Sequence, residues 1–393
     1  MKLSRPVWAE INLDNLAHNM RETRRIVNKN TKITAVIKAD GYGHGAVSIG
    51  QTLIKNGADR FAVATLSEAI QLRASFLDIE IMVLGYTPEE LAKDVIKNNI
   101  IQTIYTLEQA KEFSKTAVQL NQTLTVHIKI DTGMNRLGMQ DKKESIDDIL
   151  EMSKLNGLFI EGIFTHFAMA DEIEKEFTLQ QVEKFNNIVN SLEKKGLNIP
   201  IKHVSNSAGI IDLPQFNMDM VRAGIMLYGL YPSKHVNHNN INLKEVMCLK
   251  AKISQVKDIE AGSGVSYGLK YKCTKKSRVA TLPIGYADGF TRMLSGKANV
   301  LVNNSKVPIL GNICMDQCII DVSGLAVNIG DEVTLFGGNN IKGISIDSVS
   351  DLLNTINYEI VCMIDKRVPR VYIQNNKKTH FKDYVLILND KKS

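Results

Sequence analysis

One lysine of the chain stands where an amine could be reactive. Lys38 directly follows the apolar run 33–37 (ITAVI) and precedes a segment in which three glycines alternate with Tyr42 and His44. Desolvation at a strand end disfavours the ammonium form and frees the amine as a nucleophile or Schiff-base partner. A lone lysine can also extend its amine to solvent. The glycines, which cost stability, favour the first reading because they indicate close approach of the backbone to a ligand.

Two later segments have the composition of a phosphate site. Residues 205–209 read Ser-Asn-Ser-Ala-Gly, and residues 222–225 read Arg-Ala-Gly-Ile. Small residues leave backbone N–H groups accessible, and these groups together with serine hydroxyls suit a dianionic phosphate. Loops of this composition are also common as ordinary turns. A Schiff-base lysine facing a phosphate site is the arrangement that pyridoxal phosphate needs.

These residues require a scaffold that brings strand ends together. Helical stretches such as 44–56 and 176–195 alternate with short strand-like runs. The runs lie at 33–37, 60–64, 79–84, 99–104, 124–130, 159–164, 200–204 and 218–221. This α/β alternation predicts a parallel sheet and favours a (β/α)₈ barrel of the TIM type. An open doubly wound sheet is the alternative, but the turn at 41–46 lacks the third glycine of its G-x-G-x-x-G fingerprint.

The barrel would gather polar residues at one end, because the active site of this fold lies at the C-terminal ends of its strands. The polar residues that close or directly follow predicted strands are Lys38, Lys129, Asp131, Thr165, His166, Ser205, Asn206, Ser207 and Arg222.

After an asparagine-rich linker at 232–244, the pattern changes. Strand-like runs at 246–257, 278–284, 299–303, 306–310, 317–322 and 331–336, with one helix at 347–356, predict a mostly antiparallel β domain. We therefore expect a barrel over 10–238 and a β domain over 239–393, with the N-terminal strand 1–9 packing on the β domain.

Composition excludes several classes of protein. The chain has 393 residues, of which 44% are hydrophobic and 23% charged, which excludes a disordered, collagenous or coiled-coil protein. The net charge is +6 without a basic stripe, so we expect no nucleic-acid partner. Five cysteines without Cys-x-x-Cys or zinc-type spacing predict no metal site and a reducing, cytoplasmic location. No run of about 18 apolar residues occurs, so we expect no membrane span.

The segment 35–45 (AVIKADGYGHG) resembles the cofactor-attachment signature of bacterial alanine racemases. The resemblance extends from about residue 7 to residue 371. Further matching segments follow in the family's order at 127–138, 165–168, 206–208, 221–225, 228–229, 265–268, 285–289, 313–317 and 358–359.

The resemblance implies roles for individual residues. Pyridoxal 5′-phosphate would be attached to Lys38, and Lys38 and Tyr267 would act as two bases on opposite faces of the substrate. Arg222 would bond the pyridine nitrogen, oriented by His166. The residues that would hold the cofactor phosphate are Tyr42, Ser207, Gly224, Ile225 and Tyr358, with Gly224 and Ile225 acting through their N–H groups. Asn206 would also belong to the cofactor-binding residues.

Further implied roles concern the substrate. Arg136 and the Met315 N–H would bind its carboxylate, and Lys129 matches a lysine that is often carbamylated and pairs with the arginine. Tyr267 and Met315 would come from the partner subunit, so the resemblance implies a homodimer with shared active sites. A substrate access channel would be lined by Asp171, Tyr286, Arg292 and Asn312, where many relatives carry arginine in place of Asn312.

The function implied is interconversion of L-alanine and D-alanine, supplying D-alanine for peptidoglycan. One alternative is a pyridoxal-phosphate-dependent decarboxylase of basic amino acids, which shares the barrel and β domain but needs an acid at the pyridine nitrogen, where Arg222 stands. The other is a non-catalytic pyridoxal-phosphate-binding protein, which resembles the barrel alone and would lack Tyr267.

Overall fold

The computed structural model of the protein describes residues 3–338 and 344–386. The outermost residues of the predicted domains, 1–2 and 387–393, lie outside this range. The chain divides into two compact units. The β unit comprises Met1–Leu16, Tyr42–Gly45 and Lys244–Ser393, and the barrel unit comprises Ala17–Gly41 and Ala46–Leu243.

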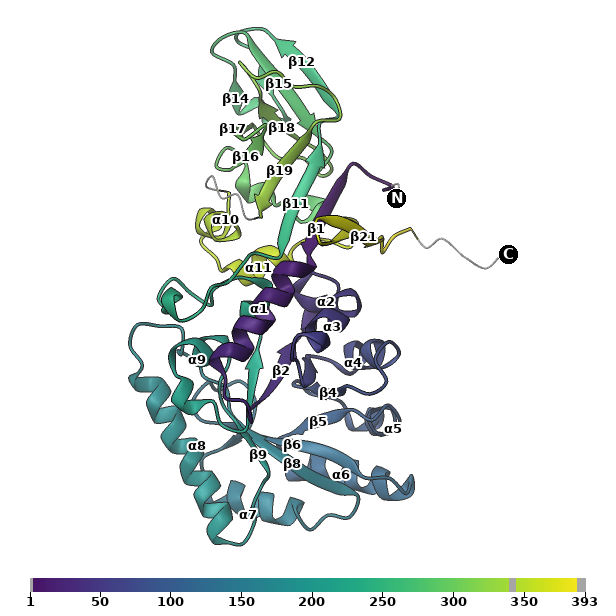
Figure 1. Ribbon diagram of the computed structural model, residues 1–393, viewed down its shortest axis with the longest axis vertical. Helices are drawn as coiled ribbons and strands as arrows, with labels where there is room; N and C mark the ends of the chain where they lie inside the picture. Colours follow the sequence, from purple (N-terminus) through teal and green to yellow (C-terminus); the bar gives the residue numbers. More distant parts are fainter. Residues whose placement is uncertain (1–2, 339–343, 387–393) are drawn as a thin grey trace, which may run out of the picture. The chain divides into compact units, whose positions relative to one another are not determined.

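The barrel unit is built on a parallel sheet that nearly closes (Figure 1). The strands follow the order β10-β2-β3-β4-β5-β6-β8-β9, and the short β7 pairs only with β6. Between β9 and β10, Asp219 N–H donates to Lys202 O at 3.1 Å. The strands are β2 (Lys32–Val36), β3 (Arg60–Val63), β4 (Glu80–Val83), β5 (Ile101–Ile104), β6 (Leu124–Asp131), β7 (Met139–Gln140), β8 (Leu158–Phe164), β9 (Ile201–His203) and β10 (Met220–Ala223). The predicted barrel is confirmed.

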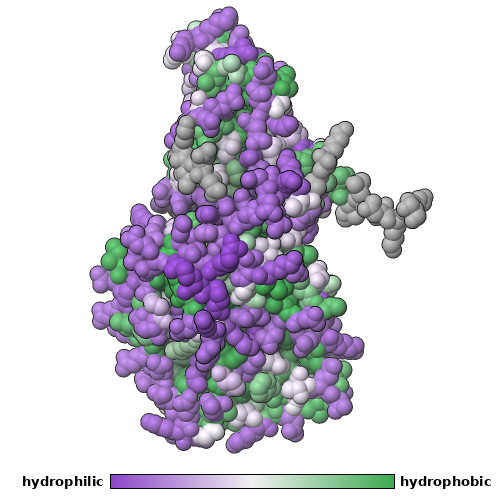
Figure 2. Space-filling model, in the orientation of Figure 1, coloured by the Kyte–Doolittle hydropathy of each residue, from purple (hydrophilic) through white to green (hydrophobic). Residues whose placement is uncertain are grey.

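Helices surround this sheet (Figure 1). Longer ones are amphipathic: α8 buries Val182, Phe185 and Ile188 on one face. The face visible in Figure 2 is mostly hydrophilic, with hydrophobic residues scattered over it. The helices are α1 (Leu13–Ile26), α2 (Lys38–Tyr42), α3 (Ala46–Lys55), α4 (Leu66–Arg73), α5 (Ala92–Lys97), α6 (Leu107–Gln119), α7 (Lys143–Met152), α8 (Glu176–Lys194) and α9 (Ser207–Asp212).

The β unit contains a ten-stranded sheet in the order β12-β15-β18-β17-β16-β19-β11-β1-β20-β21, and its pairs are antiparallel except β1 with β20. Its strands are β1 (Val7–Asn12), β11 (Met247–Lys252), β12 (Gln255–Ile259), β15 (Ser277–Leu282), β16 (Asn299–Val302), β17 (Ser305–Leu310), β18 (Cys318–Asp321), β19 (Glu332–Gly337), β20 (Arg370–Gln374) and β21 (Lys377–Lys382). A separate pair joins β13 (Gly264–Val265) to β14 (Tyr271–Lys272). The helices of the unit are α10 (Ile346–Leu353) and α11 (Asn357–Cys362).

Local details of the β unit differ from the sequence prediction. The run 246–257 is two strands, because the chain changes partner at Ile253: β11 pairs with β1 and β19, whereas β12 pairs with β15. The prediction also missed α11, β20 and β21. A helix of six residues is too short to display a clear apolar period, and β21 is mostly exposed and lysine-rich.

Within the described residues, no helix is long and apolar enough to cross a membrane. The same residues contain no cluster of three or more His, Cys, Asp or Glu side chains that could hold a metal ion.

Gly43, one of the glycines after Lys38, is required by packing inside the β unit. Gly43 has a φ of +77°, and a Cβ at this position would lie 2.4 Å from the carbonyl oxygen of Val361. Tyr372 Oη donates to His44 O at 3.0 Å, and Arg370 Nε donates to Gly43 O at 2.9 Å. The backbone of this segment is therefore in direct contact with α11 and β20.

Replacing Gly43 by alanine should lower the thermal unfolding midpoint substantially. The new Cβ would clash with a backbone atom, and alanine would also have to adopt an unfavourable positive φ. Gly196 is the matched control, since its φ is +86° but a Cβ there meets nothing within 4 Å. Gly196→Ala should cost about 1–2 kcal/mol from the backbone alone. Equal shifts of the two midpoints in a calorimetric scan would contradict the packing argument.

Candidate active site

Lys38 is held at the end of β2 by a left-handed turn. Ala39 and Asp40 both have φ 52° and ψ 47°, a conformation that L-residues avoid. The turn is fixed by its neighbours: Ala39 N–H donates to Glu68 Oε1 at 2.6 Å, and Asp40 Oδ1 accepts from the N–H of Ala46, the first residue of α3. Strain of this kind persists where the surroundings enforce it, and functional sites are common examples.

Arg222, on β10, is buried with most of its guanidinium donors satisfied. The side chain is 3% exposed. Nη1 donates to Nδ1 and O of His203 at 2.7 and 3.2 Å, and Nη2 donates to Thr165 O and Val204 O at 2.8 and 2.9 Å. Burial and the charge of Arg136 lower the pKa of Arg222 to about 9, so it stays charged at neutral pH. Its Nε–H has no partner in the described part of the chain and is available to an acceptor.

The charges of four cationic side chains of the barrel unit act on His166. Burial and then the charges of Arg222, Arg136, Lys129 and Lys38 hold the pKa of His166 well below its usual range. His166 is therefore neutral, and its Nδ1 accepts a hydrogen bond from Arg222 Nη2 at 3.2 Å. The barrel thus brings together the residues predicted at four of its strand ends, and the site they form is strongly positive.

Lys129, on β6, is an amine in an unusual environment. It is 7% exposed, and its Nζ donates to the carbonyl of Ile130 at 2.7 Å. Burial and the neighbouring charge of Arg222 lower its pKa to about 7. A large fraction of Lys129 is therefore a neutral amine at physiological pH.

Arg136 lies on the exposed loop that follows β6. The loop is anchored by Asp131, whose Oδ1 accepts from the N–H groups of Gly133 at 2.9 Å and Asn135 at 3.0 Å. Asn135 takes the left-handed conformation with φ 55°, which asparagine tolerates better than most residues. This fixed turn presents the Arg136 side chain to solvent.

The two predicted phosphate loops meet inside the barrel unit. Asn206 caps α9 by accepting from the Gly209 N–H at 3.0 Å. Ser207 Oγ accepts from the Gly224 N–H at 2.9 Å, which leaves the hydroxyl proton of Ser207 free to be donated. The N–H of Ile225 has no partner within the described residues. A hydroxyl and a backbone N–H are therefore available to an anion at this point.

Two phenols lie together in the β unit. The ring of Tyr42 lies 6.2 Å from that of Tyr358 on α11, measured between centroids. Tyr42 is buried, and burial raises the pKa of its phenol, so the group remains protonated and able to donate.

Tyr267 is an exposed tyrosine on a rigid turn of the β unit. Its side chain is 69% exposed, at the start of the 3₁₀ segment η5 (Tyr267–Leu269). Asn312, which is 8% exposed, donates its amide to Tyr267 O at 2.6 Å and accepts from Ser266 Oγ at its own carbonyl. Asn312, predicted in an access channel, thus holds the Tyr267 turn.

The other predicted residues of the β unit lie on neighbouring loops. Tyr286 is 40% exposed and Met315 is 52% exposed. Tyr286 N–H donates to Cys314 O, while Met315 O accepts from Ala287 N–H, both at 3.0 Å. The Met315 N–H itself has no partner among the described residues. Arg292 is exposed at the start of η7 (Arg292–Leu294).

Asp171 belongs to the barrel unit, in the loop after β8. Its backbone carbonyl accepts from Ser233 Oγ at 2.5 Å, so this loop is tied to the segment that leaves the barrel.

Sequence reasoning missed three residues inside the barrel: His127, Glu161 and His203. His203 bridges Arg222 to His127, whose Nε2 lies 2.8 Å from Glu161 Oε2. The alternation along β6 held a signal, because His127 and Lys129 are two residues apart and share a strand face.

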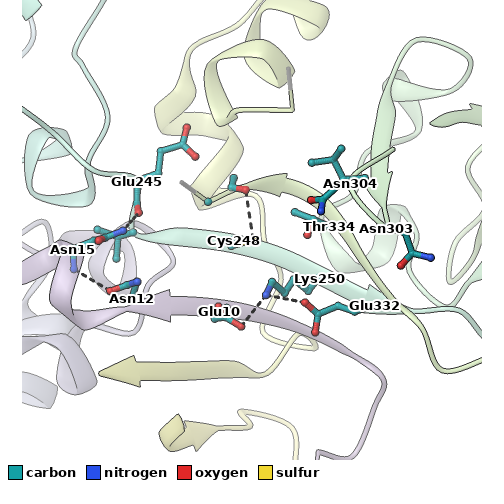
Figure 3. A pocket seen from close by; sticks show the side chains of 14 residues that line it. Glu10, Asn12, Asn15, Glu245, Cys248, Lys250, Asn303, Asn304, Glu332 and Thr334 are labelled. Atoms are coloured by element: carbon teal, nitrogen blue, oxygen red, sulfur yellow. Dashed lines mark hydrogen bonds and ion pairs between the residues drawn. The ribbon is translucent and has the colours of Figure 1, made fainter. Parts of the chain in front are cut away.

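A polar hollow of about 580 Å³ lies within the β unit (Figure 3). Its centre is Lys250, whose Nζ lies 3.2 Å from Glu10 Oε2 and 2.8 Å from Glu332 Oε1. Burial raises the pKa of Glu245, on its wall, to about 7. No predicted site residue lines this hollow, and its lysine is already paired with carboxylates, so we assign it no role.

Comparison with known proteins gives one family over nearly the whole chain. Residues 11–232 match the family model of the alanine racemase N-terminal domain, and residues 246–372 match that of the alanine racemase C-terminal domain. The alanine racemase of Clostridium tetani is 50% identical over 97% of this chain and 99% of its own length. Alanine racemase 1 of Clostridium acetobutylicum is 49% identical over the same shares. A solved alanine racemase of Clostridium difficile has a TM-score of 0.95 at 45% identity, covering 98% of this chain and 100% of that chain.

Proposed function

Because the chain belongs to the alanine racemase family and is an isomerase that interconverts L-alanine and D-alanine, we propose that it works with pyridoxal 5′-phosphate held on Lys38. The observation that supports this proposal is that Lys38, Lys129, Arg136 and Arg222 all lie near enough to His166 for their charges to lower its pKa. Such a group of cations suits a cofactor phosphate and a substrate carboxylate. D-alanine for peptidoglycan is the product expected of this family.

The residues present fit the cofactor. The free Nε–H of Arg222 can donate to the pyridine nitrogen, and an arginine there keeps that nitrogen unprotonated. The Ser207 hydroxyl and the Ile225 N–H can donate to the phosphate, with Gly224 and Asn206 positioning the loop. We also propose Tyr42 and Tyr358 as phosphate ligands, on the family resemblance of the segments that contain them. When bound, the cofactor makes the α-proton of the amino acid removable by spreading the electron pair left on the α-carbon.

Two bases then account for racemisation. We propose that the Lys38 amine takes the α-proton from one face while the Tyr267 hydroxyl gives a proton to the other, with the roles reversed for the opposite substrate. Arg136 and the Met315 N–H would hold the carboxylate so that only the α-hydrogen exchanges. The access channel would be lined by Asp171, Tyr286 and Arg292, with Asn312 acting behind Tyr267.

We also propose a homodimer with shared active sites. Tyr267, Leu269, Met293 and Met315 expose 69, 57, 61 and 52% of their side chains. Large apolar side chains that are this exposed on adjoining loops are typical of a surface that meets another chain. The five free thiols are consistent with a reducing, cytoplasmic location.

If Lys38 carries the cofactor, Lys38→Ala should abolish both racemisation and the visible absorption band of the Schiff base. The measurement is a chiral product assay with L-alanine, combined with a spectrum of the purified protein with added cofactor. Lys55→Ala, in the last turn of α3, is the control and should retain both signals. A Schiff-base band that persisted in the Lys38 variant would overturn the assignment.

Shared sites predict complementation between two inactive variants. Tyr267→Phe should reduce kcat by about 100-fold or more, the usual contribution of a general acid–base, with little loss of cofactor binding. When Lys38→Ala and Tyr267→Phe subunits are mixed and reassociated, one of the two sites in each mixed dimer regains both bases. Activity should recover in proportion to the mixed dimers formed. No recovery, with mixed dimers demonstrated by mass spectrometry, would place both bases in one chain.

Lys129 is proposed to carry a carbamate that pairs with Arg136. Its neutral amine attacks carbon dioxide, a nitrogen–carbon bond forms and one amine proton leaves, so a cation becomes an anion. The pKa of about 7 supports this, because only the unprotonated amine reacts.

The carbamate should therefore accumulate as pH rises through about 7 at constant dissolved carbon dioxide, since the neutral amine fraction grows. A carbon-13 NMR spectrum with labelled bicarbonate should show one carbamate signal that Lys129→Ala removes. Lys154→Ala, on the surface after α7, should leave it in place. A spectrum without this signal above pH 8 would refute the modification.

A further inference from the structure

A chain of hydrogen bonds runs through the interior of the barrel from Arg222 toward the N-terminal ends of the strands. Arg222 Nη1 lies 2.7 Å from His203 Nδ1, His203 Nε2 lies 2.8 Å from His127 Nδ1, and His127 Nε2 lies 2.8 Å from Glu161 Oε2. Arg222, His203 and His127 are 3% exposed or less, and the Glu161 side chain is 14% exposed. The buried arginine at the mouth is thus linked to a carboxylate at the other end.

Arginine fixes the direction of every bond in this chain. The guanidinium can only donate, so His203 Nδ1 carries no proton and its Nε2 must carry one. His203 Nε2–H therefore donates to His127 Nδ1, and His127 Nε2–H donates to the Glu161 carboxylate. Burial lowers the pKa of both histidines, which keeps them neutral, so each ring carries a single proton.

Glu161 is held as an anion at the end of the chain. Burial by itself raises its pKa, but the hydrogen bond from His127 and the charge of Arg60 outweigh burial and lower the pKa to about 2. Arg60 Nη2 lies 2.9 Å from Glu161 Oε2 and 2.6 Å from Glu80 Oε2. Arg60 Nη1 also lies 3.2 Å from His127 Nε2. This contact is not a hydrogen bond, because both nitrogens carry protons in the tautomers given above.

We propose that Glu161 and His127 are positioning residues that act through His203 to fix the orientation of the Arg222 guanidinium and to offset its charge. The inference rests on the role given above to Arg222 at the cofactor nitrogen. Hydrogen bonds in series polarise one another, so the carboxylate makes His127 Nδ1 and then His203 Nδ1 better acceptors. Arg222 has no carboxylate in direct contact among the described residues. The chain of hydrogen bonds connects it instead to the distant carboxylate of Glu161.

Glu161→Gln and Glu80→Gln form a matched pair. Each removes one carboxylate from Arg60 and leaves the other, but only Glu161 touches an imidazole. In proton–nitrogen NMR spectra of the full-length protein labelled at histidine, with and without cofactor, the wild type should show both His127 and His203 protonated at Nε2. Glu161→Gln should move both Nε2 proton signals upfield as the bonds weaken, whereas Glu80→Gln should leave them in place. Either histidine protonated at Nδ1, or equal shifts in the two variants, would overturn the proposal.

Kinetics test the consequence for Arg222. Glu161→Gln should lower kcat about tenfold, the loss expected for a charge-assisted hydrogen bond, with the KM for alanine unchanged and Glu80→Gln near wild type. His127→Gln, which keeps one acceptor and one donor, should retain more activity than His127→Phe. Shifted signals with unchanged kcat would overturn the positioning role. If the wild type did not racemise alanine, the proposed function would fail, while the NMR result would still decide whether the chain of bonds exists.

Discussion

The buried guanidinium of Arg222 is the constraint from which much of the barrel interior follows. A charge removed from water costs several kcal/mol unless it is paired and hydrogen-bonded. Here its donors are satisfied mainly by carbonyls at the ends of β8 and β9 and by two neutral imidazoles. Barrels of this type usually fill their interior with layers of branched aliphatic side chains. In this protein, part of that space holds the hydrogen-bonded side chains of His203, His127 and Glu161. These polar groups are present because Arg222 must remain charged at the C-terminal ends of the strands.

The same constraint explains the electrostatics of the site. Lys38, Lys129 and Arg136 add three more basic side chains near Arg222. Burial, together with the charges of Arg222 and Arg136, lowers the pKa of both His166 and Lys129. Cations at this density repel one another, and bound anions would offset that repulsion. A phosphate, a substrate carboxylate and a carbamate on Lys129 would each relieve this repulsion. Binding of these anions would therefore also stabilise the folded site.

The sequence predicted the strand-end residues well, because parallel strands bring their C-terminal ends to one edge whatever the helices between them do. Lys38, Lys129, His166 and Arg222 follow from this rule alone. The roles of His127 and Glu161 could not be predicted in this way. They lie before the strand ends, and their importance arises from contacts between strands that no local pattern encodes. The division of 246–257 into two strands was also missed, since a change of pairing partner leaves apolar alternation intact.

The turn that carries Tyr267 poses a different energetic problem. Ser266 and Leu269 have φ values of 61° and 46°, which a non-glycine backbone adopts at a cost of about 1–3 kcal/mol each. Buried Asn312 enforces this conformation, yet the side chain that the turn displays is mostly exposed. The strained turn does not bury the side chain that it displays, so the energetic cost of the turn is not offset by packing within the same chain. It is explained if the phenol must be rigid before it meets a surface outside its own subunit, because a flexible tyrosine would lose conformational entropy on every encounter.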